Sequence, residues 1–319
     1  MWKYLSSNQE QDFLLSLHLI DGKNDSEIIK KIYTISNNKE KNYHIYKIKK
    51  RNGTYRTIYE PNLNLKIIQE NILHNILEQK HISKYAKAYK KGINLIENAK
   101  PHLNQKIILK LDIRNFFDSI SFTQIYNACF PIEYFPESIG ILLTNLCTCY
   151  DTLPQGTKTA PYISNLVLQD FDNTIGSYCE SQNIAYTRYC DDMTFSGDFN
   201  YHQVIKLVRQ ELSKLGLTLN KDKIRVITRK NRQVVTGIVV NEKLQVSSNY
   251  RKKIRQEIYY ISKYGLYSHL KKSGEAISKE KYLNVLLGKI NFVLQVNKND
   301  KEFIKYQKYI INLIKKNTK

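Results

Sequence analysis

The spacing of apolar residues in the first quarter of the chain predicts two helical regions with a hairpin between them. Residues 1–36 place leucine and isoleucine in broken stripes at a helical period. The pattern changes to strand character over 43–60, around Asn52 and Gly53, a pair that favours a tight turn. The helical period returns over 64–79, where one face would carry Leu65, Ile68, Ile72 and Ile76.

The middle of the chain predicts a sheet. In residues 109–113, alternation places three apolar side chains on one face and leaves Asp112 beside Lys110 on the other. Residues 184–189 and 193–196 are runs of β-branched and aromatic residues on either side of two adjacent aspartates. Such runs favour strands, so we expect a tight hairpin with the aspartate pair at its tip.

The other elements follow from the same two periods. Helices are expected over 137–149 and 203–215, and Thr159 is a candidate N-cap for a helix with Pro161 in its first turn. That helix would bury the stripe of Ile163, Leu166, Val167 and Phe171. Short strands are expected at 217–219 and 224–227, a further hairpin at 234–240 and 244–246, and helices from about residue 249 onward.

Charge adds the first indication of a partner. The 319 residues carry a net charge of +21, from 50 Lys or Arg against 29 Asp or Glu. Residues 243–319 alone hold 18 basic and 5 acidic residues, a net charge of +13. An excess of this size implies a polyanionic partner, and nucleic acid is the first candidate. The tyrosines that interleave with the charge are Tyr259, Tyr260, Tyr264 and Tyr267.

The cysteines and the apolar runs bear on the compartment. The five cysteines are odd in number and none has zinc-ligand spacing, so we expect reduced, mostly buried thiols. No apolar run approaches the length of a membrane span, and residues 1–20 are unlike a signal peptide. These features predict a soluble cytoplasmic protein.

The aspartates carry the candidate chemistry. Adjacent like charges such as Asp191 and Asp192 are unfavourable unless a divalent cation neutralises them, although a solvated turn is the ordinary explanation for a lone pair. Asp112 lies about 80 residues earlier on another strand, a separation that suits a shared site in a folded sheet. Carboxylate oxygens suit Mg²⁺, and two such ions can assist nucleotidyl transfer.

Five short blocks occur in the order found in reverse transcriptases, and they cover roughly residues 45–245. They are RTIYEP at 56–61, LDIRNFFDSI at 111–120, LPQG at 153–156, YCDD at 189–192 and LTLNKDK at 217–223. Two more elements, N-A-x-x-H at 98–102 and V-T-G at 235–237, resemble those that mark retron reverse transcriptases. The chain therefore resembles the retron reverse transcriptases.

This resemblance implies an α+β fold of the right-hand polymerase type, with an antiparallel palm sheet plus helices. We expect N-terminal helices and fingers over 1–106, a palm over 107–246 with a fingers insertion around 120–152, and a basic helical thumb over 247–319. The implied activity is RNA-directed DNA synthesis from dNTPs with two Mg²⁺ ions. Retrons copy part of their own noncoding RNA into DNA covalently attached to that RNA, and they are implied to act in antiphage defence, usually with a separate effector protein.

The resemblance also implies roles for single residues. Asp112, Asp191 and Asp192 would be the catalytic metal carboxylates, and Ile113 would lend its backbone carbonyl to a metal. Phe117 matches the steric gate that selects deoxynucleotides, although an ordinary core phenylalanine stays open as its explanation. Phe116 is expected in the core.

Nucleotide-binding roles follow for three more residues. Arg56 fits the fingers arginine that clamps the triphosphate, because a planar guanidinium suits phosphate oxygens. Gln155 would touch the nucleotide sugar or the templating base. Lys223 would protonate the departing pyrophosphate, with a surface lysine as the alternative. The hairpin at 234–246 resembles the primer grip.

RNA contacts are expected from two places. Asn98 and His102 belong to the N-A-x-x-H element and are the first candidates. For His102, a purely structural role is the alternative to RNA contact. The start of the thumb carries a basic cluster that suits RNA phosphates: Arg251, Lys252, Lys253 and Arg255. A solvated basic face with core tyrosines is the competing explanation for this region.

Some positions depart from the family pattern. Cys190 stands where retrons usually have alanine, Lys158 lies in a stretch that more often reads A-P-T-S-P, and Asp118 replaces a frequent proline. The nearest alternatives are a reverse transcriptase of a group II intron or an abortive-infection system. Against the intron alternative, the sequence ends with the predicted thumb, so we expect no maturase or endonuclease domain. A noncatalytic RNA-binding scaffold is the alternative from another class.

Overall fold

The computed structural model describes residues 5–50, 53–273 and 278–317, which form two compact units. The first unit comprises the chain up to Ile93 together with Leu109–Phe195 and Phe199–Val226. The second comprises Asn94–Ile108, Ser196–Asp198 and the chain from Ile227 onward. The predicted division into fingers, palm and thumb, with boundaries at residues 106 and 246, is a different division and stays a prediction.

The first unit begins with two capped helices, α1 (Ser7–Ser16) and α2 (Asp25–Asn37). The Ser6 side chain accepts a hydrogen bond from the Gln9 backbone N–H, and the Gln9 side chain bonds back to Ser6. This capping box satisfies backbone donors that a helix start leaves free. The predicted N-terminal helices are confirmed, with a break between them.

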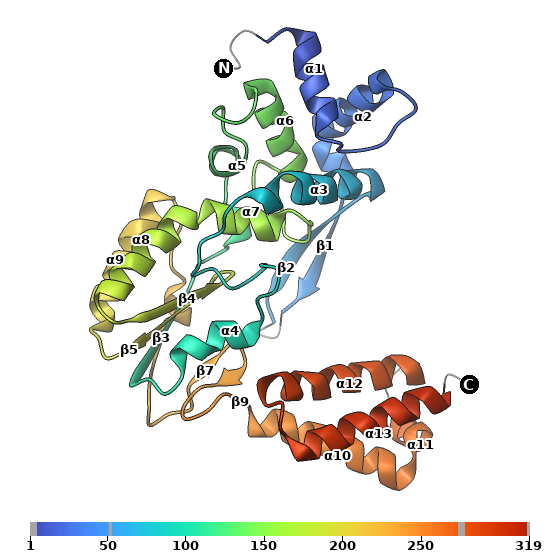
Figure 1. Cartoon of the computed structure of the whole chain (residues 1–319), viewed down its shortest axis with the longest axis vertical. Coiled ribbons are helices and arrows are strands. Elements are labelled where there is room, and N and C mark those ends of the chain that lie inside the picture. Colours follow the sequence, from blue (N-terminus) through green and yellow to red (C-terminus); the bar gives the residue numbers. More distant parts are fainter. Residues whose placement is uncertain (1–4, 51–52, 274–277, 318–319) are drawn as a thin grey trace. The chain divides into compact units, whose positions relative to one another are not determined.

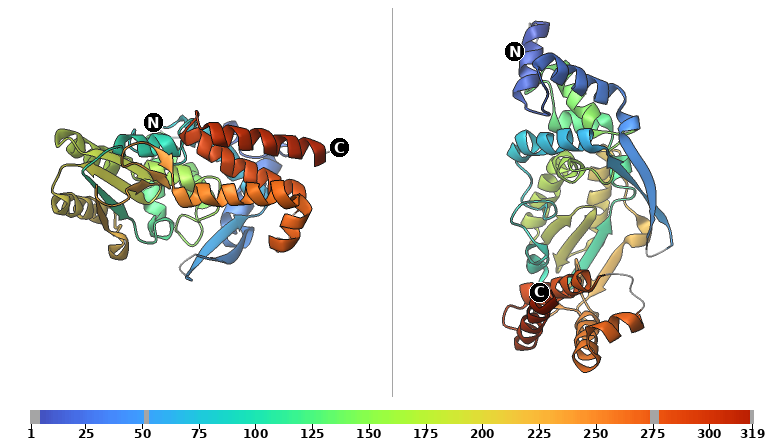
Figure 2. Two further views of the ribbon diagram at one scale, coloured as in Figure 1. Left: turned by 90° about the horizontal axis from the view of Figure 1, so that it is seen from below. Right: turned by 90° about the vertical axis from the view of Figure 1, so that its right-hand side faces the viewer.

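A two-stranded ribbon follows, in which β1 (Tyr43–Lys49) pairs antiparallel with β2 (Tyr55–Pro61). The ribbon projects from the helices around it, and most of its side chains are exposed (Figure 2). Asn52 of the predicted turn lies outside the described residues, whereas Gly53 has a φ of +85°, which glycine adopts readily. The predicted hairpin is confirmed.

The predicted helix over 64–79 forms as α3 (Leu63–Asn75) and a short 3₁₀ turn, η3 (Leu77–Gln79). Its expected apolar face is buried, at Leu65, Ile68, Ile72 and Ile76. These side chains join the large core of the first unit. Helical periodicity was sufficient here because one face meets the core and the other meets water.

A four-stranded sheet lies at the centre, in the order β4-β5-β3-β6. Its strands are β3 (Ile107–Asp112), β4 (Ala185–Tyr189), β5 (Asp192–Gly197) and β6 (Arg225–Thr228). Helices α8 (Gln169–Ser181) and α9 (Tyr201–Lys214) lie beside it in Figure 1. The strand expected at 217–219 is reduced to a single bridge between Leu219 and Ile113.

Three helices complete the first unit: α5 (Phe122–Cys129), α6 (Glu137–Cys147) and α7 (Ala160–Val167). The single helix expected after Pro161 is wrong, because the chain changes direction at Leu168 and continues as α8. Thr159 is at the N-cap position, as expected, but its side chain makes no capping bond. The Ala160 N–H instead donates to the Thr157 hydroxyl at 3.3 Å.

The second unit contains α4 (Leu95–Ala99), η4 (Lys100–His102) and a small sheet of β7 (Val234–Val235), β8 (Ile238–Val239) and β9 (Gln245–Val246). The continuous strand expected over 234–240 is wrong. Thr236 and Gly237 have φ values of 45° and 87°, and positive φ at both central residues makes a tight hairpin turn between β7 and β8.

From residue 248 onward the described residues are mainly helical, as the sequence predicts, in α10 (Ser248–Tyr264), α11 (Leu266–Ser273), α12 (Lys279–Val296) and α13 (Lys301–Asn317). Their apolar faces form a core of their own, which includes Ile254, Ile258, Leu286 and Ile290. The five cysteines are free and buried, as expected. Among the described residues, no helix is both long and apolar enough to span a bilayer.

Candidate active site

The three predicted aspartates meet at one end of the central sheet. Asp112 is the last residue of β3, Asp191 lies in the turn after β4, and Asp192 is the first residue of β5. Since β3 and β5 are neighbours, their ends bring these carboxylates together. The Ile113 N–H donates to the Asp191 carbonyl at 3.2 Å, which joins the turn to the end of β3.

The turn that carries Asp191 has an unusual backbone. Cys190 has a φ of 60°, in the left-handed region that few residues other than glycine occupy. Its side chain is buried, and its sulfur accepts a hydrogen bond from the Tyr89 hydroxyl at 3.4 Å. Tyr89 itself has a φ of 58°. Two left-handed residues from separate segments thus meet here, and such backbone conformations are typical of functional sites that the surrounding structure holds in place.

Asp112 is nearly enclosed, with 4% of its surface exposed. The Lys223 ammonium lies 2.7 Å from its Oδ2, and the Asn220 amide nitrogen lies 3.4 Å from its Oδ1. The Asn220 backbone N–H also donates to the Asp112 carbonyl at 2.8 Å. The LTLNKDK block therefore contacts Asp112 through Asn220 and Lys223.

The carboxylates interact through their charges. Burial raises the pKa of Asp191, and the neighbouring charge of Asp112 raises it further. Burial and repulsion from Asp191 raise the pKa of Asp192 to about 6. Burial alone would lower the pKa of Lys223, but its hydrogen bond to Asp112 and the aspartate charges leave that pKa raised. The site thus concentrates negative charge and keeps Lys223 protonated at neutral pH.

The donor set fits Mg²⁺ under one condition. Among the described residues, no group of three or more His, Cys, Asp or Glu side chains is arranged to hold a metal ion by itself. Polymerase Mg²⁺ is usually held by one or two carboxylates together with substrate phosphates and water. The three aspartates can supply these carboxylates, but they repel one another, and Lys223 is paired with one of them, Asp112. Substrate phosphates would therefore complete the coordination of a bound ion. The residues therefore fit a metal that arrives with its nucleotide.

The LPQG turn packs against the basic ribbon. The Tyr59 N–H of β2 donates to the Gln155 carbonyl at 2.8 Å. Gly156 has a φ of +119°, and an added Cβ would lie 3.0 Å from the Tyr59 carbonyl oxygen, so only glycine fits. Arg56 is exposed further along β2, opposite Ile48. Gln155 thus lies where the LPQG turn meets the ribbon, and Arg56 lies three residues before the contacted Tyr59 on the same strand.

The two phenylalanines after Asp112 differ in burial. Phe116 is buried in the core, as expected, whereas Phe117 is only half-buried. Their ring centroids lie 5.3 Å apart. A half-buried ring five residues after Asp112 has a face left for a ligand, which suits the predicted gate. Lys158, whose role the sequence left open, forms an exposed ion pair with Glu70 at 3.4 Å.

The expected RNA contacts of Asn98 and His102 are not compatible with this structure. Their side chains have 1% and 0% of their surface exposed, so neither can reach a nucleotide. The Asn98 amide donates to the Thr236 hydroxyl at 3.3 Å, and a His102 ring nitrogen lies 2.7 Å from the Ser196 hydroxyl. The N-A-x-x-H element thus supports the turn of the V-T-G element and β5.

The basic cluster of α10 divides into two pairs. Arg251 bonds Asp300 at 2.6 Å, and Arg255 binds both oxygens of Glu302 at 2.6 and 2.7 Å. Arg251 thus connects α10 to Asp300, the residue before α13, and Arg255 connects α10 to Glu302 in α13. Lys252 and Lys253 are exposed, and Arg255 also keeps exposed surface beside its ion pair with Glu302.

Sequence reasoning missed one pair of residues beside the turn that carries Asp191. Arg188 and Asp172 are both fully buried and form an ion pair. The signal was available, since Arg188 alternates with Tyr186 along β4 and so shares its inward face. An arginine on the buried face of a strand requires a buried partner.

Comparison with known proteins agrees with the geometry. Residues 48–282 match the family described as "Reverse transcriptase (RNA-dependent DNA polymerase)". The chain is 31% identical to the Retron Ec86 reverse transcriptase of Escherichia coli over 226 residues, 69% of this chain and 70% of that protein. It is also 31% identical to the Retron Ec83 reverse transcriptase of Escherichia coli, over 68% of this chain and 75% of that protein.

The chain belongs to the retron-type reverse transcriptases. Its assignment as an RNA-directed DNA polymerase with a right-hand fold is thereby confirmed. Among solved structures, this reverse transcriptase is similar to telomerase from Candida albicans, with a TM-score of 0.46 and 10% identity over 84% of this chain and 65% of that chain. A telomerase from Candida tropicalis has a TM-score of 0.43 and 13% identity, over 66% of this chain and 55% of that chain.

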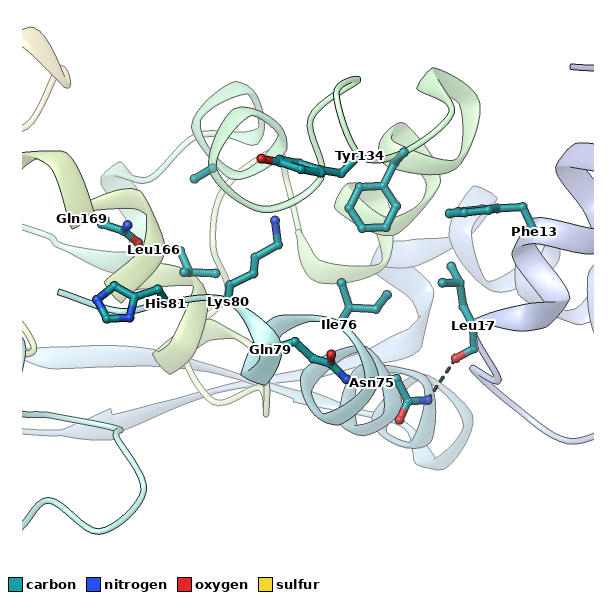
Figure 3. Close-up of a pocket in the computed structure, with 12 residues that line it drawn as sticks. Phe13, Leu17, Asn75, Ile76, Gln79, Lys80, His81, Tyr134, Leu166 and Gln169 are labelled. Carbon is teal, nitrogen blue, oxygen red and sulfur yellow. Dashed lines mark hydrogen bonds between the residues drawn. The ribbon is translucent and has the colours of Figure 1, made fainter. Parts of the chain in front are cut away.

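This reverse transcriptase also has a pocket apart from the aspartates. It has a volume of about 570 Å³, and both apolar and polar side chains line it, with Lys80, His81 and Gln169 among the polar ones, as Figure 3 shows. The Lys80 ammonium lies 5.3 Å from the centre of the Tyr134 ring. None of the predicted site residues lines this pocket. This pocket and the site formed by the three aspartates are therefore separate features.

Proposed function

We propose that this reverse transcriptase copies part of its own structured noncoding RNA into DNA that stays covalently attached to that RNA. Its relatives named above are retron reverse transcriptases, which supports this activity. We further propose a cytoplasmic role in antiphage defence, together with a separate effector protein. The net charge of +21 supports a polyanionic partner.

The observation that carries the catalytic part is the meeting of Asp112, Asp191 and Asp192 at one end of the sheet. These three carboxylates would hold two Mg²⁺ ions, with the Ile113 carbonyl beside them. When bound, the ions would stabilise the attacking and leaving oxygens of nucleotidyl transfer. The chain itself supplies the fixed backbone that keeps the repelling carboxylates close together.

Other residues select and orient the nucleotide. Arg56 would bind the triphosphate with its guanidinium, and Gln155 would contact the sugar or the templating base. The half-buried ring of Phe117 would lie under the sugar and clash with a ribose 2′-hydroxyl. Lys223 holds a proton next to Asp112, and it would give that proton to the departing pyrophosphate.

The helices from α10 onward would bind the cognate RNA. Lys252 and Lys253 are exposed on α10, and Tyr259 and Tyr264 are exposed further along the same helix. Exposed lysines can neutralise phosphates, and exposed rings can stack on unpaired bases. Arg251 and Arg255 would contribute chiefly through their ion pairs, which hold the helices in place.

The test is purification of the protein from cells that contain its genomic neighbourhood, followed by sequencing of bound nucleic acid. We expect one structured RNA and a DNA copy that stays with it after protein is removed by protease and denaturant. Asp191→Asn should retain the RNA and lose the DNA. Recovery of neither a defined RNA nor attached DNA from the wild-type protein would contradict the proposal.

A further inference from the structure

Arg188 is a fully buried arginine directly before the YCDD block. Its Nε lies 2.8 Å from Asp172 Oδ1 and its Nη2 lies 2.5 Å from Oδ2, so both ends of the carboxylate are bound. Neither side chain has exposed surface. Burying two charges costs desolvation free energy that their attraction often only offsets, so stability alone is a weak reason for this pair.

The third guanidinium nitrogen has a different partner. Arg188 Nη1 donates to the Cys190 carbonyl oxygen at 2.9 Å. That carbonyl belongs to the peptide group between Cys190 and Asp191, which is planar and moves as one unit. Cys190 also holds a φ of 60°, which needs support from its surroundings. A bond that fixes this carbonyl therefore fixes the direction in which the chain enters Asp191.

Asp172 connects this bond to a rigid element. It lies in α8, and its Oδ1 also accepts a hydrogen bond from the Tyr186 hydroxyl at 2.8 Å. The backbone of Arg188 is held separately, because its N–H donates to the Tyr85 carbonyl at 2.9 Å and its own carbonyl accepts from the Lys87 N–H at 2.8 Å. The arginine thus has little freedom to leave the Cys190 carbonyl.

We propose that Arg188 and Asp172 are positioning residues for catalysis: they hold the Cys190–Asp191 peptide so that the Asp191 carboxylate faces the other two aspartates. This inference rests on the proposed role of Asp191 as a metal carboxylate. Residues that orient a metal ligand typically change metal affinity or activity 10- to 100-fold when they are replaced. A pair that served only to fill the core could be exchanged for apolar side chains without such a loss.

The main variant is the double substitution Asp172→Leu with Arg188→Met in the full chain bound to its RNA. It fills similar space, leaves no unpaired charge and removes the donor to the Cys190 carbonyl. We expect cooperative unfolding and RNA binding to persist. The rate constant of primer extension should fall about 10- to 100-fold, and the Mg²⁺ concentration for half-maximal rate should rise.

Two further variants separate positioning from packing. Tyr186→Phe removes one bond to Asp172 but leaves the bond between Arg188 and Cys190, so its rate and Mg²⁺ dependence should stay within about twofold of wild type. Arg188→Lys keeps a positive charge for Asp172, but a single ammonium cannot bind both carboxylate oxygens and the carbonyl in the same geometry. It should lose rate and gain Mg²⁺ dependence in the same direction as the double variant.

Wild-type rate and Mg²⁺ dependence in the double variant would overturn the proposal. If the double variant does not fold, Arg188→Lys decides: a wild-type rate overturns the proposal, and a slower rate with a higher Mg²⁺ requirement supports it. Asp191→Asn is measured beside them. If Asp191→Asn is itself fully active, the proposed catalytic site fails, whatever Arg188 does.

Discussion

The turn that carries Asp191 and helix α10 are both strongly charged, but they hold their charges in opposite ways. At the turn, charges lie at the ends of buried strands, and Asp112 has partners within hydrogen-bonding distance. On α10, two arginines are used in ion pairs within the protein, while Lys252 and Lys253 face solvent. Short-range chemistry requires the first arrangement, and long-range attraction of a polyanion requires only the second.

This difference predicts which substitutions should impair the reaction and which should impair RNA binding. A buried site depends on the position of each atom, so single changes there should affect the reaction far more than binding. A solvated basic face works through summed charge, so single changes should be mild and should depend on salt.

Replacing Asp112 by Asn should reduce primer extension on the order of 10³-fold, because a lost metal carboxylate removes several kcal/mol of transition-state stabilisation. Rates at saturating RNA and dNTP measure this. Asp222→Asn is the matched control, since Asp222 is an exposed aspartate in the same block as Lys223. A rate for Asp112→Asn close to that of Asp222→Asn would refute the assignment.

Replacing Phe117 by Val should weaken discrimination against ribonucleotides by about 10- to 100-fold, because it removes a clash of a few kcal/mol. The readout is the ratio of kcat/KM for dNTP and rNTP. Phe116→Leu serves as the control, since Phe116 is buried and should affect stability rather than sugar choice. Unchanged discrimination in Phe117→Val would place the gate elsewhere.

Replacing both Lys252 and Lys253 by Glu should weaken cognate RNA binding by about 10- to 30-fold at 150 mM salt. The slope of log K against log salt should fall by roughly 1.5, since each lost phosphate contact contributes about 0.7 to 0.9. Lys23 and Lys30 are exposed residues of the first unit, outside the helices from α10 onward, and give a control with the same change of charge. Equal losses in both variants would mean that only net charge matters.

Replacing Asn98 by Ala should lower the free energy of unfolding by about 1 kcal/mol, because it removes the hydrogen bond that the buried Asn98 amide donates to the half-buried Thr236 hydroxyl. RNA affinity of the folded protein should change little. Thermal unfolding and an RNA titration at a temperature where the variant is folded test both statements. Lost RNA affinity with unchanged stability would restore Asn98 as an RNA contact.

Asp192→Asn should stabilise the metal-free protein slightly at pH 7.5. The folded-state pKa of Asp192 is about 6 against an ordinary value of 3.8, so the folded chain holds this proton more tightly. That contribution to stability is full below about pH 4 and is lost as pH rises through about 6. Because Asp192 is exposed, screening limits the gain to about 1 kcal/mol, or roughly 2–4 °C in Tm. An equal gain at pH 4 would contradict this account.

Much of the fold follows from the sequence because its periodicity is simple. The stripe of α3 has one clear buried side, and the strand that ends at Asp112 shows a regular alternation of apolar residues although both of its faces are buried. The failures occurred where the backbone departs from that rule. Thr236 is β-branched yet has a positive φ, so a pattern of strand-forming residues concealed the turn between β7 and β8.

The site was predicted unevenly for a related reason. The aspartates lie in short sequence blocks that can be recognised from the sequence alone. The residues that hold them in position come from segments distant in the sequence. Arg188 was passed over because its partner Asp172 lies in another element, and the ion pairs of Arg251 and Arg255 require residues near 300. Asn98 and His102 belong to a recognisable element, but only the fold shows that they are buried.

The most direct test of this separation is one single-turnover extension assay at saturating cognate RNA, run on Asp191→Asn and on the variant with both Lys252 and Lys253 replaced by Glu. The account predicts that Asp191→Asn stays about 10³-fold slow although its RNA is bound, while the lysine variant recovers to within a few-fold of wild type. A lysine variant that stays as slow as Asp191→Asn at full RNA occupancy would contradict it, as would an Asp191→Asn protein that extends at the wild-type rate.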